Sequence, residues 1–416
     1  MTDTGKALPS LDEFERQLAH FINATLLGGG AQVTRDTRLF EDGHMNSLRI
    51  LDLIAVVEKT LGRRIPDRAV RLANFRSIAA IVQAFHPHAT ASPDVAAPLS
   101  GSGRLFERRT ARARFASPVE ALEARGDVRP AGAGQVALGG MALDVLRAVD
   151  RTVVRWAHSL GAAERRYPSL IPLDVLERAG QVESFPQHLT LAAPYDAAPL
   201  SADERAPRHA LAPAVCYHAY PEWEGRTLGP APSVLTACGR CYRYEGAHHA
   251  SLERLWEFTM REIIVLGARE QVESVRQSLV RRVTELATTL ELDAAVESAT
   301  DPFFAAGDEG RRLMQQAGAL KYELLLTVDA YGRAVAAASF NHHHDFFSTR
   351  FHIQLANGGA AHSGCIAFGL ERWVLALLAQ HGVDERAWPA AVREWLDESR
   401  RADVGGQGSS IDGAGA

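Results

Sequence analysis

The chain has 416 residues, of which 46% are hydrophobic and 23% charged, and its formal net charge is −5. A chain of this length can form two to four domains with a large core, and its charge balance argues against a nucleic-acid partner. No apolar run approaches the roughly 20 residues that span a bilayer, and the N-terminus lacks the pattern of a signal peptide. We therefore expect a cytoplasmic protein without a membrane partner, in which the four cysteines are thiols or metal ligands.

Residues 10–86 are predicted to form an all-α helical bundle. Apolar residues recur there at the three- and four-residue spacing of amphipathic helices, in three stretches. They are Leu11, Phe14, Leu18, Phe21 and Ile22, then Leu48, Leu51, Ile54, Val57 and Leu61, and last Phe75, Ile78, Ile81, Val82 and Phe85. Residues 87–115 are predicted to be a flexible linker, because Pro, Ala, Ser and Gly dominate its first part. The arginines at 104–114 belong either to that solvated linker or to a docking patch for the helical module.

Residues 116–402 are predicted to form an α+β domain with a central antiparallel sheet flanked by helices. Apolar residues at helical spacing alternate there with strand-like runs that are separated by turn residues. The expected strands are 233–245, 256–266, 322–328, 335–340 and 350–355. Short connections favour antiparallel pairing, and the sequence lacks the common glycine-rich phosphate loops. Residues 403–416 are rich in Gly, Ser and Ala and are expected to be a disordered tail.

Ser47 lies where a loop meets the second predicted helix, in Asp42-Gly43-His44-Met45-Asn46-Ser47-Leu48. A serine at such a junction ordinarily caps the helix. The Asp-Gly lead-in, the Ser-Leu start and the pattern of residues 10–86 resemble acyl or peptidyl carrier proteins, in which the matching serine carries 4′-phosphopantetheine. The resemblance implies that Ser47 is the attachment site and that a phosphopantetheinyl transferase is a partner. Carriers usually have Asp before this serine, and Asn46 in its place is expected to weaken recognition by the transferase.

A second group of residues suits the binding of ATP. Cys238-Gly239-Arg240-Cys241-Tyr242-Arg243-Tyr244-Glu245 ends one predicted strand, and Phe258 lies on the next. Arg243 and Glu245 share a strand face, so one can bind a phosphate and the other a base, although an isolated Arg-x-Glu is ordinarily a surface ion pair. With Gly369-Leu370-Glu371-Arg372 opening a predicted helix, these segments resemble motifs 2 and 3 of class II aminoacyl-tRNA synthetases. Residues 167–172 resemble motif 1 more loosely, which implies a homodimer.

The synthetase resemblance implies a role for each matching residue. Arg243 would bind the α-phosphate of ATP and the carboxylate that attacks it, and Arg372 would hold the γ-phosphate; these two are the expected catalytic residues. Glu245 would contact the adenine amino group, Phe258 would stack on adenine, and Glu323 would position Mg²⁺. The chemistry is adenylation, in which fixed guanidinium groups and Mg²⁺ stabilise the charge that spreads over the phosphate oxygens.

Cys216, Glu262 and Cys365 are candidate ligands of Zn²⁺, which prefers sulfur, nitrogen and oxygen donors in a tetrahedral arrangement. A single buried cysteine is more often a small apolar core residue. As a set, the three resemble the ligands of methanogen-type seryl-tRNA synthetases and their bacterial relatives, the amino acid:[carrier protein] ligases. In that group the open zinc position takes the α-amine of the substrate, which explains selection for free amino acids.

Two rival metal sites are present in the sequence. Cys238 and Cys241 have the spacing of half a zinc ribbon or a redox pair, although a second Cys pair is missing from the sequence. The run His342-His343-His344 with Asp345 can bind a metal through at most two of its imidazoles, because side chains alternate along a strand. Asn341 and Asp345 lie where seryl-type enzymes have polar active-site residues. The alignment with those enzymes through His342-His343-His344 allows a shift of one residue.

Together these resemblances imply an enzyme that activates a small amino acid, of the glycine or alanine class, with ATP. The aminoacyl group would then pass to the phosphopantetheine thiol of a carrier protein, either the fused one or another chain. One alternative is a seryl-type tRNA synthetase, which would need a tRNA-binding module that the sequence does not show. Another is a carrier or scaffold protein with a degenerate synthetase-like domain, and the intact ATP residues argue against it. Neither the amino acid nor the fate of the thioester can be derived from the sequence.

Overall fold

The structure is a computed structural model that describes the chain in segments. They are residues 9–26, 32–39, 49–62, 65, 72–86, 104–110, 118–193, 207–244, 249, 252–299, 320–329 and 331–407. Two compact units result, one made of Met1–Gly103 with Ser298–Lys321 and the other of Arg104–Glu297 with Tyr322–Ala416. Ser47 and Glu245 lie outside the described residues.

The described part of residues 9–86 is helical and has a hydrophobic core of its own. Its elements are α1 (Leu11–His20), the π-helical turn η1 (Phe21–Leu26), α2 (Arg49–Leu61), α3 (Leu72–Phe75) and α4 (Ile78–Phe85). Serine caps begin two of the helices: the Ser10 hydroxyl accepts from the Glu13 backbone N–H at 3.2 Å, and the Ser77 hydroxyl from Ala80 at 3.2 Å. Phe14, with 0% of its surface exposed, lies in the core that these helices enclose.

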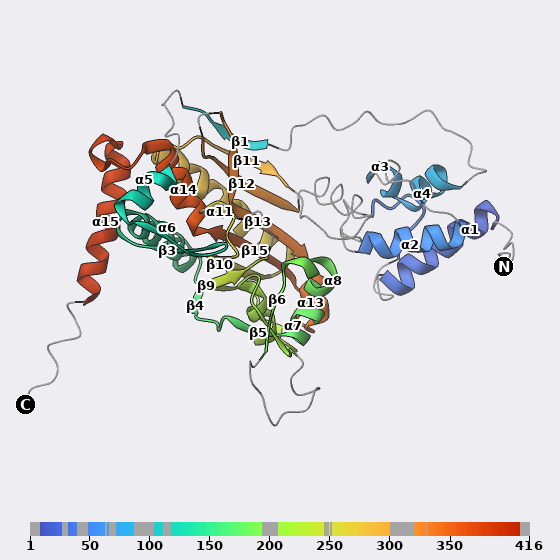
Figure 1. The fold of residues 1–416 in the computed structure, drawn as a ribbon. Helices are drawn as coiled ribbons and strands as arrows, with labels where there is room; N and C mark the ends of the chain where they lie inside the picture. The colour runs from blue at the N-terminus through green and yellow to red at the C-terminus, as the bar shows by residue number, and fades with distance from the viewer. Residues whose placement is uncertain are drawn as a thin grey trace, which may run out of the picture. The chain divides into compact units, whose positions relative to one another are not determined.

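The second unit is built on an eight-stranded sheet with the strand order β1-β11-β12-β13-β15-β10-β9-β4 (Figure 1). In that order the strands are β1 (Arg104–Arg108), β11 (Ala294–Ser298), β12 (Lys321–Thr327), β13 (Ala334–His344), β15 (His362–Gly369), β10 (Glu257–Gly267), β9 (Ser233–Tyr242) and β4 (Ala163–Arg165). The predicted antiparallel pairing is found among the central strands β13, β15, β10 and β9, but β4 pairs with β9 in parallel, so the sheet as a whole is mixed. A parallel neighbour needs a long connection, and the chain between β4 and β9 supplies one.

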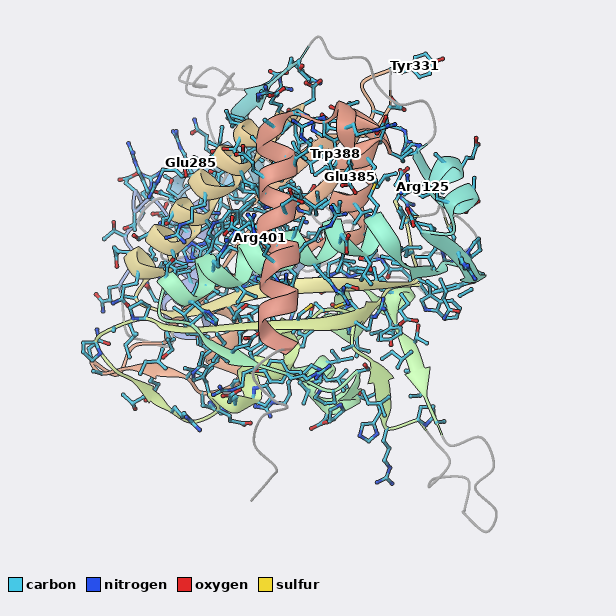
Figure 2. The ribbon with its side chains drawn as sticks, turned by 90° about the vertical axis from the view of Figure 1, so that its left-hand side faces the viewer. Arg125, Glu285, Tyr331, Glu385, Trp388 and Arg401 are labelled. Atoms are coloured by element: carbon cyan, nitrogen blue, oxygen red, sulfur yellow. The ribbon has the colours of Figure 1, made fainter. Side chains whose placement is uncertain are left out.

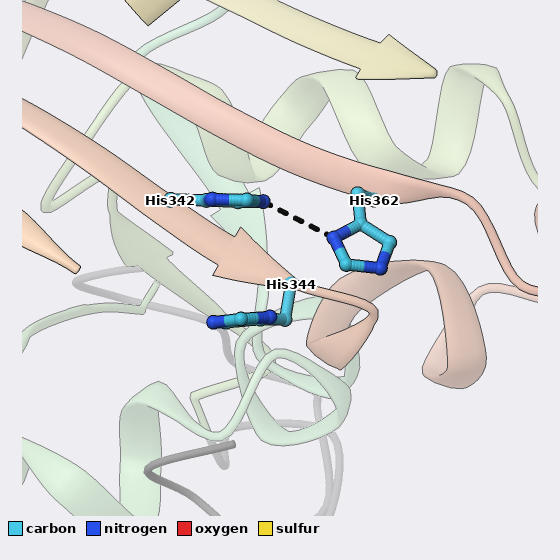
Figure 3. Close-up of side chains that lie close together, drawn as sticks. All are labelled: His342, His344 and His362. Carbon is cyan, nitrogen blue, oxygen red and sulfur yellow. Dashed lines mark hydrogen bonds between the residues drawn. The ribbon is translucent and has the colours of Figure 1, made fainter. Parts of the chain in front are cut away.

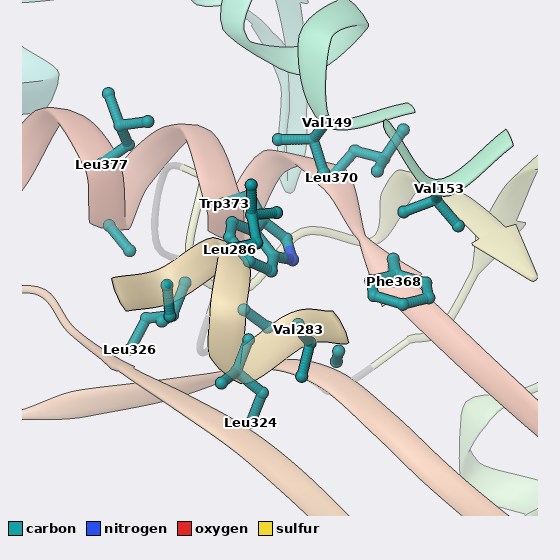
Figure 4. Packing of buried hydrophobic residues seen from close by; sticks show 14 of the residues in the cluster. Val149, Val153, Val283, Leu286, Leu324, Leu326, Phe368, Leu370, Trp373 and Leu377 are labelled. Carbon is teal, nitrogen blue, oxygen red and sulfur yellow. The ribbon is translucent and has the colours of Figure 1, made fainter. Parts of the chain in front are cut away.

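Four helices of this unit are long. They are α6 (Gly140–Ser159), α11 (Arg269–Thr289), α14 (Leu370–His381) and α15 (Ala390–Gln407). All four contribute side chains to one core cluster on one face of the sheet, where Trp373 is 0% exposed among Val149, Val283 and Leu326 (Figure 4). Alternate residues of the central strands face the other way and form a second cluster around Tyr220, Ile264 and Phe351. The candidate site lies on this second face.

Shorter elements complete the unit. The helical ones are α5 (Pro118–Arg125), α7 (Leu173–Arg178), α8 (Gln181–Ser184), η3 (Pro186–His188), η4 (Cys216–His218), α10 (Ala219–Glu222), α13 (Phe346–Arg350) and η5 (Glu385–Ala387). The strands are β2 (Val128–Gly132), β3 (Gln135–Leu138), β5 (Leu170–Pro172), β6 (Thr190–Ala192), β7 (His209–Leu211), β8 (Thr227–Leu228) and β14 (Gln354–Leu355). They form three small sheets, β5-β7-β6, β2-β3 and β14-β8.

Two predicted boundaries differ from the structure. Residues 104–108 were expected within the linker, but they form β1, which pairs antiparallel with β11 and completes an edge of the large sheet. Residues 403–407 were expected in the tail, but α15 continues through them to Gln407. A segment that pairs with a strand far away in the chain need not carry a strong local pattern, which is why composition did not reveal β1.

Tyr331 lies in the turn between β12 and β13 and points away from the unit (Figure 2). Its surface is 97% exposed, as expected of a side chain at the tip of a turn. Among the residues that the structure describes, no helix combines the length and the apolar character needed to cross a membrane.

The Arg261 guanidinium connects β10 to α6 and is 4% exposed. It donates to both carboxylate oxygens of Asp150, at 2.7 and 3.0 Å, and to Glu164 at 2.9 Å. Asp150→Ala leaves a buried cation without its bidentate partner and is expected to lower the free energy of unfolding by about 3 kcal/mol. Glu164→Ala is the matched control: its side chain is 50% exposed, so the expected loss is at most about 1 kcal/mol. Urea unfolding would measure both, and equal losses would contradict the prediction.

Candidate active site

Three strands at the centre of the sheet position the candidate site. β10 pairs antiparallel with β15 on one side and with β9 on the other. In this register Ile264 is opposite Cys365. Glu262 comes two residues before Ile264 on β10, so its side chain lies on the same face of the sheet. Cys216 comes from η4, a single 3₁₀ turn that packs against that face. The local period of two therefore places Glu262 and Cys365, while tertiary packing brings Cys216 to them.

The side chains of Cys216, Glu262 and Cys365 converge. One ligand atom from each lies within 4.8 Å of the others, and all three residues are buried. The Glu262 Oε2 atom is buried without a hydrogen-bond partner, and leaving a buried carboxylate oxygen unsatisfied is costly. Two sulfur donors and one carboxylate are a donor set that Zn²⁺ accepts, and three protein ligands leave a fourth position for another molecule. The residues therefore fit a zinc ion.

The pKa values in the cluster follow from its burial. Burial raises the pKa of the Glu262 carboxyl above its usual value. Contact with the Cys216 thiol, together with burial, raises the pKa of Cys365 well above its usual value. Buried thiols and carboxyl groups become anionic ligands when a divalent cation lies among them.

Arg243 and Phe258 lie beside this cluster. The Arg243 guanidinium carbon is 5.6 Å from the centre of the Phe258 ring, and its Nε donates to the Pro213 carbonyl at 2.8 Å. The positive charge of Arg243 also acts to lower the pKa of Glu262, against the larger effect of burial. A guanidinium can bind an anionic group such as a phosphate, and an aromatic ring beside it can stack on a flat base.

The start of α14 is tied to the neighbouring strand by Glu371, a residue to which the sequence analysis assigned no role. Both Glu371 carboxylate oxygens accept from the Thr259 backbone N–H at 2.9 Å, and one accepts from the Thr259 hydroxyl at 2.8 Å. Glu371 is 2% exposed, and burial raises its pKa above the usual value. Arg372 follows, and it donates to the backbone carbonyls of Glu253 at 2.8 Å and Ala336 at 2.9 Å. Only the fold pairs α14 with Thr259, so spacing alone did not identify Glu371.

The remaining predicted residues are placed as follows. Glu323 is half-buried on β12. Asn341 is opposite Cys365 on β13 and donates to the Cys365 carbonyl at 3.2 Å, so it lies on the face of the Cys-Glu-Cys cluster. Asp345 precedes α13. The structure therefore brings Asn341 to the cluster and does not place Glu323 in it.

The rival pair Cys238 and Cys241 does not converge. Both lie on β9, three residues apart, so their side chains point to opposite faces of the sheet. Cys238 packs against the core cluster of the long helices, and Cys241 is fully buried in the cluster on the other face. One metal ion or one disulfide cannot be shared across the sheet in this way.

The fold is similar to that of class II aminoacyl-tRNA synthetases. The family model of the tRNA synthetase class II core domain (G, H, P, S and T) matches residues 207–381. Among solved structures, SerRS of M. kandleri in complex with A. aeolicus tRNASec matches with a TM-score of 0.63 and 27% identity, over 71% of this chain and 63% of that chain. Seryl-tRNA synthetase of Pyrococcus horikoshii, complexed with ATP, shares the fold, with a TM-score of 0.53 and 15% identity over 70% of this chain and 64% of that one.

Similar proteins of known function identify a family within the class II synthetases. Amino acid–[acyl-carrier-protein] ligase 1 of Bradyrhizobium diazoefficiens is 33% identical over 266 residues, which cover 60% of this chain and 80% of that protein. The type-2 serine–tRNA ligase of Methanococcus aeolicus is 28% identical over 309 residues, which cover 68% of this chain but 59% of the ligase. The chain belongs to the family of amino acid–[acyl-carrier-protein] ligases, and the predicted class of enzyme is thereby confirmed.

Proposed function

We propose that the protein activates a small amino acid, of the glycine or alanine class, with ATP and transfers it to the phosphopantetheine thiol of a carrier protein. The observation that carries this proposal is the position of the Cys-Glu-Cys cluster beside Arg243, on one face of a class II synthetase sheet. A site for an amine thus lies next to a site for a phosphate. An amino acid has its amine one carbon away from the carboxylate that must reach the phosphate.

The first step joins the amino acid to ATP. The carboxylate oxygen attacks the α-phosphorus, the bond to the β-phosphate oxygen breaks, and pyrophosphate leaves. Arg243 would stabilise the charge on the α-phosphate oxygens, Phe258 would stack on adenine, and Arg372 would hold the γ-phosphate. Glu371 would act as a positioning residue, because it orients the start of the helix that carries Arg372. Mg²⁺ would accompany ATP, and we propose that Glu323 positions this ion. We propose that Glu245 contacts the amino group of adenine.

Cys216, Glu262 and Cys365 are the residues that would hold Zn²⁺. When bound, the ion supplies a Lewis acid with one open position that a neutral amine can occupy. The residues themselves exclude water, since all three are buried. Discrimination would follow, because a carboxylic acid without an α-amine leaves that position without its ligand.

The second step transfers the aminoacyl group to a thiol. The sulfur attacks the adenylate carbonyl, AMP leaves, the thiol proton is lost, and a thioester forms. We propose that residues 10–86 are the carrier and that Ser47 bears the phosphopantetheine arm, which a phosphopantetheinyl transferase attaches. Fusion would raise the effective concentration of that thiol at the active site. Dimerisation through residues 167–172 stays a prediction.

The test is intact-protein mass spectrometry of the full chain, after treatment with a phosphopantetheinyl transferase and incubation with ATP, Mg²⁺ and one amino acid at a time. We expect one phosphopantetheine increment followed by one aminoacyl increment. Ser47→Ala should abolish both increments and keep amino-acid-dependent pyrophosphate exchange within about twofold of wild type, because adenylation precedes transfer.

Other outcomes separate the parts of the proposal. Exchange without any loading would mean that the carrier is a different chain. Loading that survives Ser47→Ala would overturn the assignment of Ser47. Charging of a tRNA in place of a carrier would favour the seryl-type alternative. If none of the amino acids supports pyrophosphate exchange, the protein would be a carrier or scaffold with an inactive synthetase-like domain.

A further inference from the structure

Three histidines form a second cluster, on the opposite face of the sheet from the cysteines. His342 and His344 lie at the end of β13, and His362 begins β15. One ring nitrogen from each lies within 4.8 Å of the others, and Figure 3 shows His342 and His362 turned toward each other, with the His344 ring stacked parallel to that of His342. The alternation of side chains along a strand allows at most two imidazoles of the His342–His344 run to converge, and the pairing of β13 with β15 adds the third, from His362.

One distance in this cluster is close to that of a metal site. His342 Nε2 and His362 Nδ1 form a hydrogen bond at 3.1 Å, and two nitrogens bound to one tetrahedral Zn²⁺ ion, each at about 2.0–2.1 Å, would be about 3.4 Å from one another. The His344 ring is stacked on His342, with centroids 4.7 Å apart and planes 7° from parallel, so binding one ion through all three residues requires the His344 ring to rotate. His343 faces the other way, with its Nδ1 3.4 Å from the Tyr220 hydroxyl, and takes no part.

The backbone is specialised at this point. A β-bulge lies between His342 and His344, because they pair with Gly364 and Ser363 respectively. His344 has a φ of 51°, in the left-handed region that residues other than glycine seldom adopt. Such a conformation costs on the order of 1–3 kcal/mol and tends to be kept at functional sites.

A carboxylate orients one of the rings from behind. Glu273, on α11, has its Oε2 3.5 Å from His342 Nδ1. Gly364 lets α11 approach, because a Cβ at that position would lie 2.8 Å from Val272. Arg276 holds the same carboxylate at 2.8 Å. A histidine that contacts a carboxylate through one nitrogen and presents the other to its neighbours has the arrangement of a metal-ligating histidine.

Two of the rings are shielded from solvent, since His342 and His344 are 6% and 8% exposed. The other charged groups that act on these rings are Arg269, Arg276, Glu270 and Asp345, two cations and two anions.

We infer that His342, His344 and His362 bind a divalent transition-metal ion of the zinc class. Three imidazole nitrogens favour such ions over Mg²⁺ or Ca²⁺, which prefer oxygen. The ion would connect the end of β13 to the start of β15. Because Cys365 lies three residues beyond His362, the ion would also stabilise the strand that carries Cys365.

The test uses the untagged full-length protein, since a histidine tag would bind metal itself. After chelation and dialysis, Co²⁺ is titrated in and followed by absorption and by the amount bound per chain. His344→Asn with His362→Gln should bind one equivalent fewer than wild type and keep any sulfur-to-cobalt charge-transfer band unchanged. Asn is the suitable replacement at His344, because it tolerates positive φ. His158→Ala, which removes a histidine with a side chain 55% exposed, should bind as wild type does.

Two further variants keep the test decisive. Cys365→Ser should lose the sulfur band yet retain the histidine equivalent, and Co²⁺ should still raise its Tm. If the double histidine variant does not fold, His362→Gln alone serves, because that ring is at a strand start and only half-buried. An unchanged stoichiometry in the folded histidine variants would overturn the inference.

Discussion

Cys365→Ser is expected to remove one bound zinc ion and to lower amino-acid-dependent pyrophosphate exchange by at least about 100-fold. Changes that merely disturb the support of a metal ligand cost about 10–100-fold in affinity or activity, and this change removes a ligand. The cluster has no spare donor among the described residues, since the metal-ligating group around Cys365 contains only Cys216 and Glu262.

Cys241→Ser is the matched control for this experiment. Cys241 is also a free, fully buried cysteine of the same core cluster, but its sulfur is not part of the convergent group. The control should keep its zinc and its exchange activity, at some cost in stability. Zinc content by elemental analysis and exchange rates would be measured for both variants. A Cys365→Ser protein that kept full zinc and activity would remove the proposed amine site.

Arg243→Ala is expected to lower pyrophosphate exchange by about 10²–10³-fold, the usual effect of losing one group that stabilises charge in a transition state. The loss should appear mainly in kcat, because the charge on the α-phosphate oxygens is largest in the transition state. Arg243→Lys should recover part of the activity, because it keeps the charge but lacks the planar fork of the guanidinium. Zinc content should stay at the wild-type level, which distinguishes this loss from that of Cys365→Ser.

Arg178→Ala provides the comparison for Arg243. Arg178 also lies over an aromatic ring, with its guanidinium carbon 4.3 Å from the centre of Phe351, and it pairs with Glu224 at 2.6 Å. It therefore matches the packing of Arg243 without a role in the proposed site, and its exchange rate should stay within about threefold of wild type. Equal losses in the two variants would show that Arg243 acts through stability alone.

Short-range patterns accounted for much of the site. The period of two along a strand placed Phe258 and Glu262 on one face of β10, and in the structure they share it. The same rule separates Cys238 from Cys241 and sends His343 away from its two neighbours. These relations depend only on residues a few positions apart, so the sequence is enough to derive them.

Local sequence patterns did not predict which distant segments of the chain contact one another. The start of α14 binds β10 through Glu371 and Thr259, 112 residues apart, and β1 joins the sheet by pairing with β11. His362 meets His342 because β13 and β15 are neighbours with a bulge between them. No periodicity within one segment encodes which distant segment it will pair with.

The sequence by itself determined the family of the catalytic domain, the residue types of its chemistry and the face of the strand on which each lies. The family resemblance implied that Cys216, Glu262 and Cys365 form one set, and the tertiary structure brings their side chains together. Only the tertiary structure decided that the sheet is mixed and that a third histidine joins the second cluster. The physical reason is that side-chain direction follows from local backbone geometry, whereas strand order and register are settled by burying both sheet faces at once.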